Sequence, residues 1–190
     1  MKDALHSLRA LAGRPWLALD TETTGLGRWD EVIEVAVVDA GGAVVFESLV
    51  RPGRPITART TALHGLTSDH VAEAPPWPRV WPDLAKMLAD RPVLAWNAAF
   101  DLRLLRQSCA RYGLPMRPPR FLCLREAFRC LHPVVRASLD AACLALSVPE
   151  RPAHRARADA EVARLVALAL IGSPGDAHTD PAIAKDSQLG

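Results

Sequence analysis

Apolar residues in the first fifty positions occur in short continuous runs rather than at helical spacing. Residues 16–19 form one such run, and residues 31–50 contain two more that are joined around Gly41 and Gly42. Runs of this length, rich in Val, Leu and Ala, are typical of buried strands. Two glycines between such runs are typical of a hairpin turn. We therefore predict a strand at 16–20 beside a pair of antiparallel strands.

From residue 51 onward the pattern changes. Residues 51–77 are rich in Pro, Thr and Ala, which predicts only short helical turns. Two short apolar runs, 92–96 and 121–124, lie between helical segments, as in β-α-β units. Helices are predicted at 1–14, 78–90, 98–112, 125–131, 138–147 and 156–171. This order predicts an α/β domain whose mixed sheet joins an antiparallel hairpin to parallel strands and is flanked by helices.

The composition is that of one globular domain. The chain has 190 residues, of which 49% are hydrophobic and 23% charged, and this balance excludes a globally disordered protein. Residues 172–190 have no hydrophobic periodicity, so we assign the domain to residues 1–171 and expect a flexible C-terminal tail. The formal net charge of +2 is too small to indicate a polyanionic partner by itself.

The cysteines and the absence of long apolar segments bear on location. The four cysteines form no C-x-x-C pair, which predicts reduced thiols in a cytosolic protein rather than a zinc site. The N-terminal residues lack the apolar core of a signal peptide, and no segment approaches the roughly 20 apolar residues of a membrane span. We therefore expect a cytoplasmic protein that makes no contact with a membrane.

The apolar run at 16–19 leads directly into two acids, Asp20 and Glu22. In an extended segment, residues at i and i+2 point to the same side of a sheet, so two buried carboxylates would repel each other. A divalent cation removes this conflict because Mg²⁺ and Mn²⁺ prefer carboxylate oxygen. The alternative is structural, since the sequence D-T-E-T-T-G also suits a turn or a helix N-cap.

Two further acids lie at the starts of predicted helices. Asp101 follows the strand at 92–96, in the region where ligands gather in open α/β sheets, and Asp159 comes five residues after His154. Each position also has a structural explanation. An acid at a helix start is stabilised by the helix dipole, Asn97 can serve as the N-cap, and His154 alone would be an ordinary loop histidine.

Together, these acids and the histidine form the set of groups that a two-metal phosphoryl hydrolase needs. Two cations about 3.5–4 Å apart hold the attacking and leaving oxygens of an in-line displacement. A histidine can take the proton from the attacking water near neutral pH. We therefore predict that the acids and the histidine converge from separate parts of the chain.

The order and spacing of these residues resemble the three motifs of the DnaQ-like, or DEDDh, 3′→5′ exonucleases. The resemblance covers about residues 16–170, and it is strongest to the branch that includes the proofreading ε subunit of bacterial DNA polymerase III. The segments that carry it are D-x-E (20–22), H-G-L-T (64–67), N-x-x-F-D (97–101), S-L-D (138–140) and H-x-x-x-x-D (154–159).

The resemblance implies a ribonuclease H-like fold and a metal-dependent exonuclease. Such an enzyme would release 5′-mononucleotides from the 3′ end of single-stranded DNA, in DNA proofreading or repair. By the same resemblance His154 is the general base, and two Mg²⁺ or Mn²⁺ ions are held by Asp20, Glu22, Asp101 and Asp159. The substrate strand would be bound by Thr23, Gly25, Leu26, His64, Asn97 and Phe100.

The resemblance leaves the substrate and the partner open. A DNA polymerase subunit is the protein partner that it suggests. One alternative is a 3′→5′ exoribonuclease that trims or degrades RNA from its 3′ end. The other is a non-catalytic nucleic-acid-binding module associated with a polymerase. The presence of all four acids and the histidine argues against that last alternative.

The chain departs from the family pattern at one position. Relatives often carry His directly before the Asn of the second motif, whereas this chain has Trp96. An aromatic side chain here can stack on a base or fill space beneath the site, and no metal ligand is lost. Asp140 is expected to be structural rather than a ligand. Four histidines match no motif: His6, His70, His132 and His178.

Overall fold

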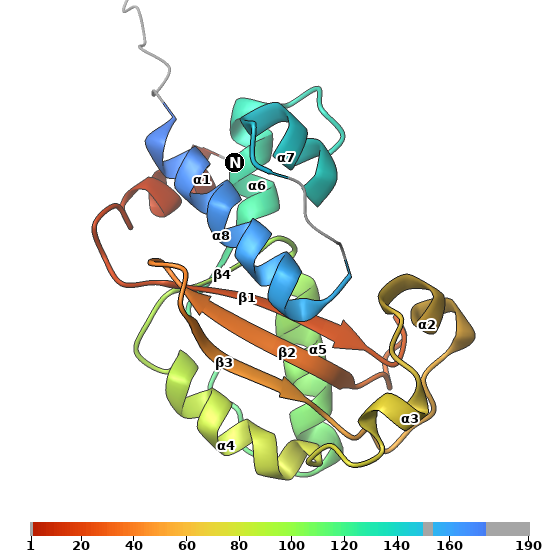
Figure 1. Ribbon diagram of the computed structural model, residues 1–190. Helices are drawn as coiled ribbons and strands as arrows, with labels where there is room; N and C mark the ends of the chain where they lie inside the picture. Colours follow the sequence, from red (N-terminus) through yellow and green to blue (C-terminus); the bar gives the residue numbers. More distant parts are fainter. Residues whose placement is uncertain (1, 150–153, 174–190) are drawn as a thin grey trace, which may run out of the picture.

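A five-stranded mixed sheet forms the centre of the protein. In the computed structural model, which describes residues 2–149 and 154–173, the strand order is β3-β2-β1-β4-β5 (Figure 1). β1 pairs antiparallel with β2, and β2 with β3, whereas β1–β4 and β4–β5 are parallel. The strands are β1 (Leu17–Thr23), β2 (Val32–Asp39), β3 (Val44–Leu49), β4 (Val93–Ala95) and β5 (Phe121–Cys123). The predicted α/β fold with a mixed sheet is confirmed.

Helices cover both faces of this sheet. α8 crosses one face, with α1, α6 and α7 beside it, and α4 and α5 lie on the other (Figure 1). The helices are α1 (Lys2–Arg9), α2 (Ala58–His64), α3 (Ser68–Val71), α4 (Trp77–Leu88), α5 (Ala98–Arg111), α6 (Leu124–Leu131), α7 (Leu139–Leu146) and α8 (Ala156–Gly172). Among the described residues, no helix combines the length and the apolar character that crossing a membrane would require.

The helix predicted at the N-terminus is shorter in the structure, and the predicted C-terminal tail lies almost wholly outside the described residues. The helix expected at 1–14 ends at Arg9 and continues as turns up to Gly13, which has a positive φ of 69°. Glycine adopts this left-handed conformation without the steric cost that a Cβ brings, so the helix stops before it. The flexible tail was expected from residue 172, but α8 extends through Gly172, and residues 174–190 lie outside the described part of the chain.

The alternation of side chains along β1 decides which helices its residues meet. Leu17 and Leu19 pack into the core beneath α4 and α5, whereas Ala18 packs into the core under α8. By the same period of two, Asp20 and Glu22 point to the α8 side. Because both faces are covered, the strand is apolar on both sides until these acids begin.

β1 is longer than the strand predicted at 16–20. Its pairing with β2 continues from Leu17 opposite Asp39 to Thr23 opposite Val32, with an irregularity after Glu22. The two acids therefore lie inside a paired strand instead of beyond its end. The reason is the partner strand, since the backbone hydrogen bonds offered by β2 keep residues 21–23 extended despite their polar side chains.

Candidate active site

Three carboxylates meet where β1 ends and α8 begins. Asp20 and Glu22 come from β1, Asp159 comes from the first turn of α8, and one oxygen atom of each lies within 4.8 Å of the other two. α8 approaches this closely because small side chains line the contact: Ala156 and Ala160 pack against the β2 side chains Ala36 and Val38. The structure thus brings together acids that are more than 130 positions apart in sequence.

Asp101 reaches the same region from the opposite face of the sheet. It lies in the first turn of α5, is buried, and its Oδ1 accepts a hydrogen bond of 2.9 Å from the hydroxyl of Thr21. Thr21 stands between the two acids of β1 and therefore points to the α5 side. Asp101 is not among the three mutually close carboxylates, but it makes the largest electrostatic contribution to raising the pKa of Asp20.

Burial raises the pKa of every one of these acids, and the charges of the neighbouring acids add to the rise at Asp20 and Glu22. Burial comes first for Asp20, whose pKa lies well above its usual value, followed by the charges of Asp101 and Glu22. The pKa of Glu22 rises to about 8 and that of Asp101 to about 7, again mainly through burial. Burial also raises the pKa of Asp159. A cation placed among these oxygens would reverse these shifts, because it favours the ionised form.

The donor set fits a hard divalent ion. It consists of carboxylate oxygens alone, contains no thiolate or buried imidazole, and is partly desolvated. Mg²⁺ and Mn²⁺ prefer such oxygen ligands. Asp20, Glu22 and Asp159 are placed to share one ion, and Asp101, on the other side of Asp20, is placed to extend the site.

His154 lies beside this cluster and is exposed. Its backbone N–H donates a 3.1 Å hydrogen bond to Oδ2 of Asp159, and its φ of 64° is in the left-handed region that non-glycine residues rarely adopt. The carboxylate of Asp159 therefore has one oxygen fixed by the turn that precedes α8. The same turn carries the imidazole of His154 to the edge of the acid cluster.

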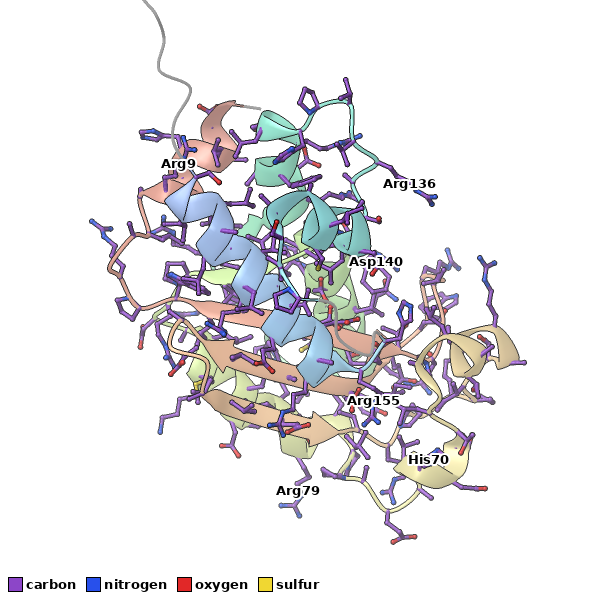
Figure 2. All side chains as sticks on the ribbon, turned by 45° about the horizontal axis from the view of Figure 1, so that its top comes forward. Arg9, His70, Arg79, Arg136, Asp140 and Arg155 are labelled. Atoms are coloured by element: carbon purple, nitrogen blue, oxygen red, sulfur yellow. The ribbon has the colours of Figure 1, made fainter. Side chains whose placement is uncertain are left out.

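An ion pair between the buried Glu34 and the exposed Arg155, which the sequence analysis missed, fixes the start of α8. Glu34 of β2 lies directly opposite Glu22 in the register of the strands and is buried. Its carboxylate accepts from Arg155 Nε (3.1 Å) and Nη2 (2.6 Å), and from the backbone N–H of Ala156 (2.9 Å). Figure 2 labels Arg155 where α8 begins, at the end of the sheet nearest α2 and α3. Glu34 thus caps the helix that carries Asp159.

Glu34 and Thr21 had only weak signals in the sequence. Glu34 interrupts the apolar run at 32–38, and an acid in a run of that kind requires a partner. Thr21 is merely the residue between two acids. The partner of each depends on tertiary contacts, so neither role follows from spacing alone.

The predicted strand-binding residues of the first motif lie at the end of β1, which Thr23 closes, and in the tight loop that follows it. The Thr23 hydroxyl donates to the carbonyl of Gly25 at 2.8 Å, and both residues are buried. A Cβ on Gly25 would lie 2.6 Å from Oδ2 of Asp30, so the loop requires glycine there. Leu26 follows and is 57% exposed. Leu26 is therefore exposed for apolar contact with a ligand, whereas Thr23 and Gly25 lie buried directly before it.

The other three predicted binding residues, His64, Asn97 and Phe100, differ in burial and in hydrogen bonding. His64 is buried in α2, where its Nδ1 accepts from Leu66 N–H and its Nε2 donates to the carbonyl of Thr23, which ties α2 to the end of β1. Burial lowers the pKa of His64. Asn97 occupies the N-cap position of α5, but its side chain makes no capping hydrogen bond. Phe100 is half-buried beneath the guanidinium of Arg103.

The remaining predictions concern residues near the site. Trp96 is half-buried against Phe128, with 5.8 Å between the ring centroids, so it fills space in the core under α8. Asp140 is exposed in the first turn of α7, where Ser138 is the N-cap (Figure 2). Asp140 makes only a minor contribution to raising the pKa of Asp159, after burial.

The sheet order, the flanking helices and the acids at one end define a ribonuclease H-like nuclease fold. A family model described as exonuclease (RNase T) matches residues 17–166. The chain therefore belongs to the DnaQ-like DEDDh exonuclease family. Members of this family depend on divalent metal ions, which agrees with the acid cluster.

Several relatives are similar to this chain in sequence. A DNA polymerase III subunit epsilon-like protein of Rhodobacter capsulatus is 35% identical over 153 residues, 76% of this chain and 22% of that protein. The uncharacterized exonuclease CP81 of Escherichia phage 186 is 38% identical over 96 residues, 50% of each chain. DNA polymerase III PolC-type of Bacillus cereus is 32% identical over 158 residues, 80% of this chain and 11% of that protein. The chain thus spans half or less of each relative's length.

Solved structures share the fold. Exonuclease X, in complex with 5′ overhanging duplex DNA, aligns with a TM-score of 0.65 and 29% identity, covering 82% of this chain and 90% of that one. The nuclease domain of 3′hExo, a DEDDh family member bound to rAMP, aligns with a TM-score of 0.66 at 17% identity, covering 83% of this chain and 90% of that one. The second likeness shows the fold alone.

Proposed function

We propose that this protein is a 3′→5′ exonuclease that acts on the 3′ end of single-stranded DNA, releases 5′-mononucleotides and serves in DNA proofreading or repair. The observation that carries the proposal is the meeting of Asp20, Glu22 and Asp159 within 4.8 Å, with Asp101 beside them. Buried acids without a cationic side chain between them are costly unless an external cation neutralises them.

Each acid has a distinct part in the proposed site. Asp20, Glu22 and Asp159 would hold one Mg²⁺ or Mn²⁺ ion between β1 and α8, and Asp101 would join Asp20 in holding a second. Two such ions, when bound, stabilise the charge on the attacking and leaving oxygens of the phosphodiester. Thr21 would keep Asp101 oriented through the 2.9 Å hydrogen bond to its carboxylate.

His154 would act as the general base. Its imidazole would accept a proton from the attacking water, a step that a positioned side chain typically accelerates about 10²–10⁴-fold. The hydrogen bond from its backbone to Asp159 supports this role because it holds residue 154 next to one of the acids. Exposure of the side chain lets the proton leave to solvent after each cycle.

The substrate strand would approach along the loop after β1. Thr23, Gly25 and Leu26 would hold the terminal nucleotide, and Asn97 and Phe100 would line its path, with His64 supporting Thr23 from behind. DNA is favoured over RNA because the relatives named above include DNA polymerase III proteins and because exonuclease X was solved with DNA. The same relatives support a DNA polymerase subunit as a partner.

One digestion experiment tests the proposal. A single-stranded DNA oligonucleotide labelled at either its 5′ or its 3′ end, and an RNA of the same sequence, are incubated with Mg²⁺, Mn²⁺ or EDTA. We expect a descending ladder from the 5′ label, immediate release of the 3′-labelled nucleotide, faster loss of DNA than of RNA, and no cleavage in EDTA. Asp20→Asn should be inactive, while Asp83→Asn, an exposed acid on α4, is the matched control. Faster loss of RNA would make the protein an exoribonuclease, and no cleavage with either metal would contradict catalysis.

A further inference from the structure

Trp29 is more exposed to solvent than the other four tryptophans of this chain. Of the five tryptophans, Trp16, Trp77 and Trp81 are buried and Trp96 is half-buried, whereas Trp29 is 60% exposed. Leaving an indole in water forgoes the large gain that its burial provides. The exposed Trp29, in the loop that follows the acids of β1, is therefore a candidate to be covered by a ligand.

Trp29 already carries a cation on one side. The guanidinium of Arg28 lies 4.4 Å from the centroid of the indole ring. A guanidinium in this position is attracted by the ring, and Trp29 stays 60% exposed with Arg28 beside it. An aromatic ring with a positive charge behind it suits a nucleobase on its open face and a phosphate at its rim.

The loop that presents Trp29 is held rigidly. Asp30 accepts hydrogen bonds from the Thr24 hydroxyl and the Gly27 N–H, which close the loop on itself. From α5, the Gln107 amide donates to the carbonyls of Gly27 and Asp30 at 3.1 and 3.0 Å. Arg103 adds a 3.3 Å hydrogen bond to the Gly27 carbonyl. Holding an aromatic side chain in place before binding reduces the entropy lost on binding.

The hydrogen bonds from Arg103 and Gln107 also place this loop along the expected course of the substrate strand. Arg103 contacts both Gly27 and the ring of Phe100, so it joins the loop to a residue assigned to the strand's path. Gln107 lies six residues beyond Asp101 on α5, about 9 Å further along the helix. A strand whose 3′ end lies among the acids would reach Trp29 with a nucleotide upstream of the cleaved one.

We propose that Trp29, backed by Arg28, is a stacking platform for an unpaired upstream base of the substrate strand. This inference rests on the proposed function, because it assumes that the ligand of the site is a nucleic acid. The platform binds any base, since every base has a flat face, and it therefore favours a single strand several nucleotides long over a single nucleotide.

The test compares two substrates that differ in length. One is a 12-nucleotide single-stranded DNA, and the other is the nitrophenyl ester of thymidine 5′-monophosphate, which has no upstream base. For Trp29→Ala we expect the ratio of kcat/KM on the oligonucleotide to kcat/KM on the ester to fall about 5- to 150-fold. Trp29→Phe keeps a flat ring and should recover most of that ratio. Leu144→Ala, a 79% exposed apolar residue on α7, is the matched control.

Tryptophan fluorescence gives an independent readout. A phosphorothioate oligonucleotide, which resists hydrolysis, should quench the emission of the wild-type protein more than that of Trp29→Phe, because Trp29 is the most exposed of the five indoles and Trp96 is half-buried against Phe128. An unchanged ratio in Trp29→Ala together with no quenching would overturn the platform while leaving the nuclease intact. A wild-type protein that cleaves neither the oligonucleotide nor the ester would instead refute the proposed function.

Discussion

The acids in and directly before the neighbouring strands β1 and β2 differ in the charge of the groups that they contact. Glu31, immediately before β2, pairs with Arg111 at 3.1 Å, and Glu34 in β2 is held by Arg155. On β1, one oxygen atom each of Asp20 and Glu22 lies within 4.8 Å of the other and of an oxygen of Asp159. We call Glu31 and Glu34 the paired acids. We call Asp20, Glu22 and Asp159 the metal-site acids.

The contrast shows that partners, rather than position in the fold, decide what a buried acid does. Glu22 and Glu34 lie directly opposite each other in the same pair of strands and are both buried. Glu34 finds its cation within the chain and becomes a structural group that caps α8. Among the described residues Glu22 forms no ion pair, and the charge of Arg155 only partly offsets the burial that raises its pKa to about 8. A buried acid of the second kind marks a site for an external cation.

The largest effect is expected when a metal-site acid is neutralised. Asp20→Asn should lower kcat/KM on the order of 10³-fold, because it removes a ligand that both ions would share. The same change should leave the thermal stability of the metal-free protein unchanged or raise it, since an amide avoids the cost of a buried charge. Steady-state kinetics and melting curves in EDTA measure the two effects. Activity within tenfold of wild type would contradict the metal assignment.

Removing the charge of a paired acid should lower the stability of the protein as well as its activity. Glu34→Gln weakens the contacts to Arg155 and to the Ala156 N–H, so we expect a loss of about 1–3 kcal/mol in the free energy of unfolding. Activity should fall about 10–100-fold because α8 no longer holds Asp159 firmly. Urea unfolding and kinetics measure both. Glu47→Gln is the matched control, since Glu47 pairs with Arg157 on the surface and such pairs contribute about 0–1 kcal/mol.

The response to pH should separate the two groups further. The pKa of Glu22 is raised from 4.5 to about 8, so the stability that its neutral form provides is fully present below pH 4.5 and is lost as the pH rises through 8. The melting temperature of metal-free protein should therefore fall between pH 5 and pH 8. Mn²⁺ at 100 times the dissociation constant that applies at pH 8 adds about 2.7 kcal/mol, or about 5–11 °C, for each ion bound at pH 8, and the same concentration adds less at pH 5. An equal Mn²⁺ effect at both pH values would contradict ionised ligands.

The smallest effect is expected at Thr21, which only orients a metal-site acid. Thr21→Val removes the hydrogen bond to Asp101 and should lower kcat about 5- to 10-fold, equivalent to about 1 kcal/mol. That hydrogen bond lowers the pKa of Asp101, which burial has raised to about 7, so its loss should move the acidic limb of the pH–rate profile upward. Thr21→Ser should restore the wild-type profile. A profile that does not move would mean that Thr21 is merely packed against Asp101.

The sequence predicted the architecture and the acids better than it predicted what holds them. Continuous apolar runs and turn residues predicted the hairpin and the order of the helices, because these depend on local sequence. The i, i+2 spacing put Asp20 and Glu22 on one face, as observed. The length of β1, the capping of α8 by Glu34 and the approach of Asp101 from the opposite face depend on the register of β1 against β2 and on helix docking, which no local pattern encodes.

Binding of metal to the isolated protein tests the central claim most directly. Titration of the metal-free wild-type chain with Mn²⁺, followed by calorimetry, should show two ions bound at pH 8, with Glu34→Gln retaining both at lower affinity. Asp20→Asn should lose both ions. A wild-type protein that binds no Mn²⁺, or an Asp20→Asn protein that binds it as tightly as wild type, would contradict the account.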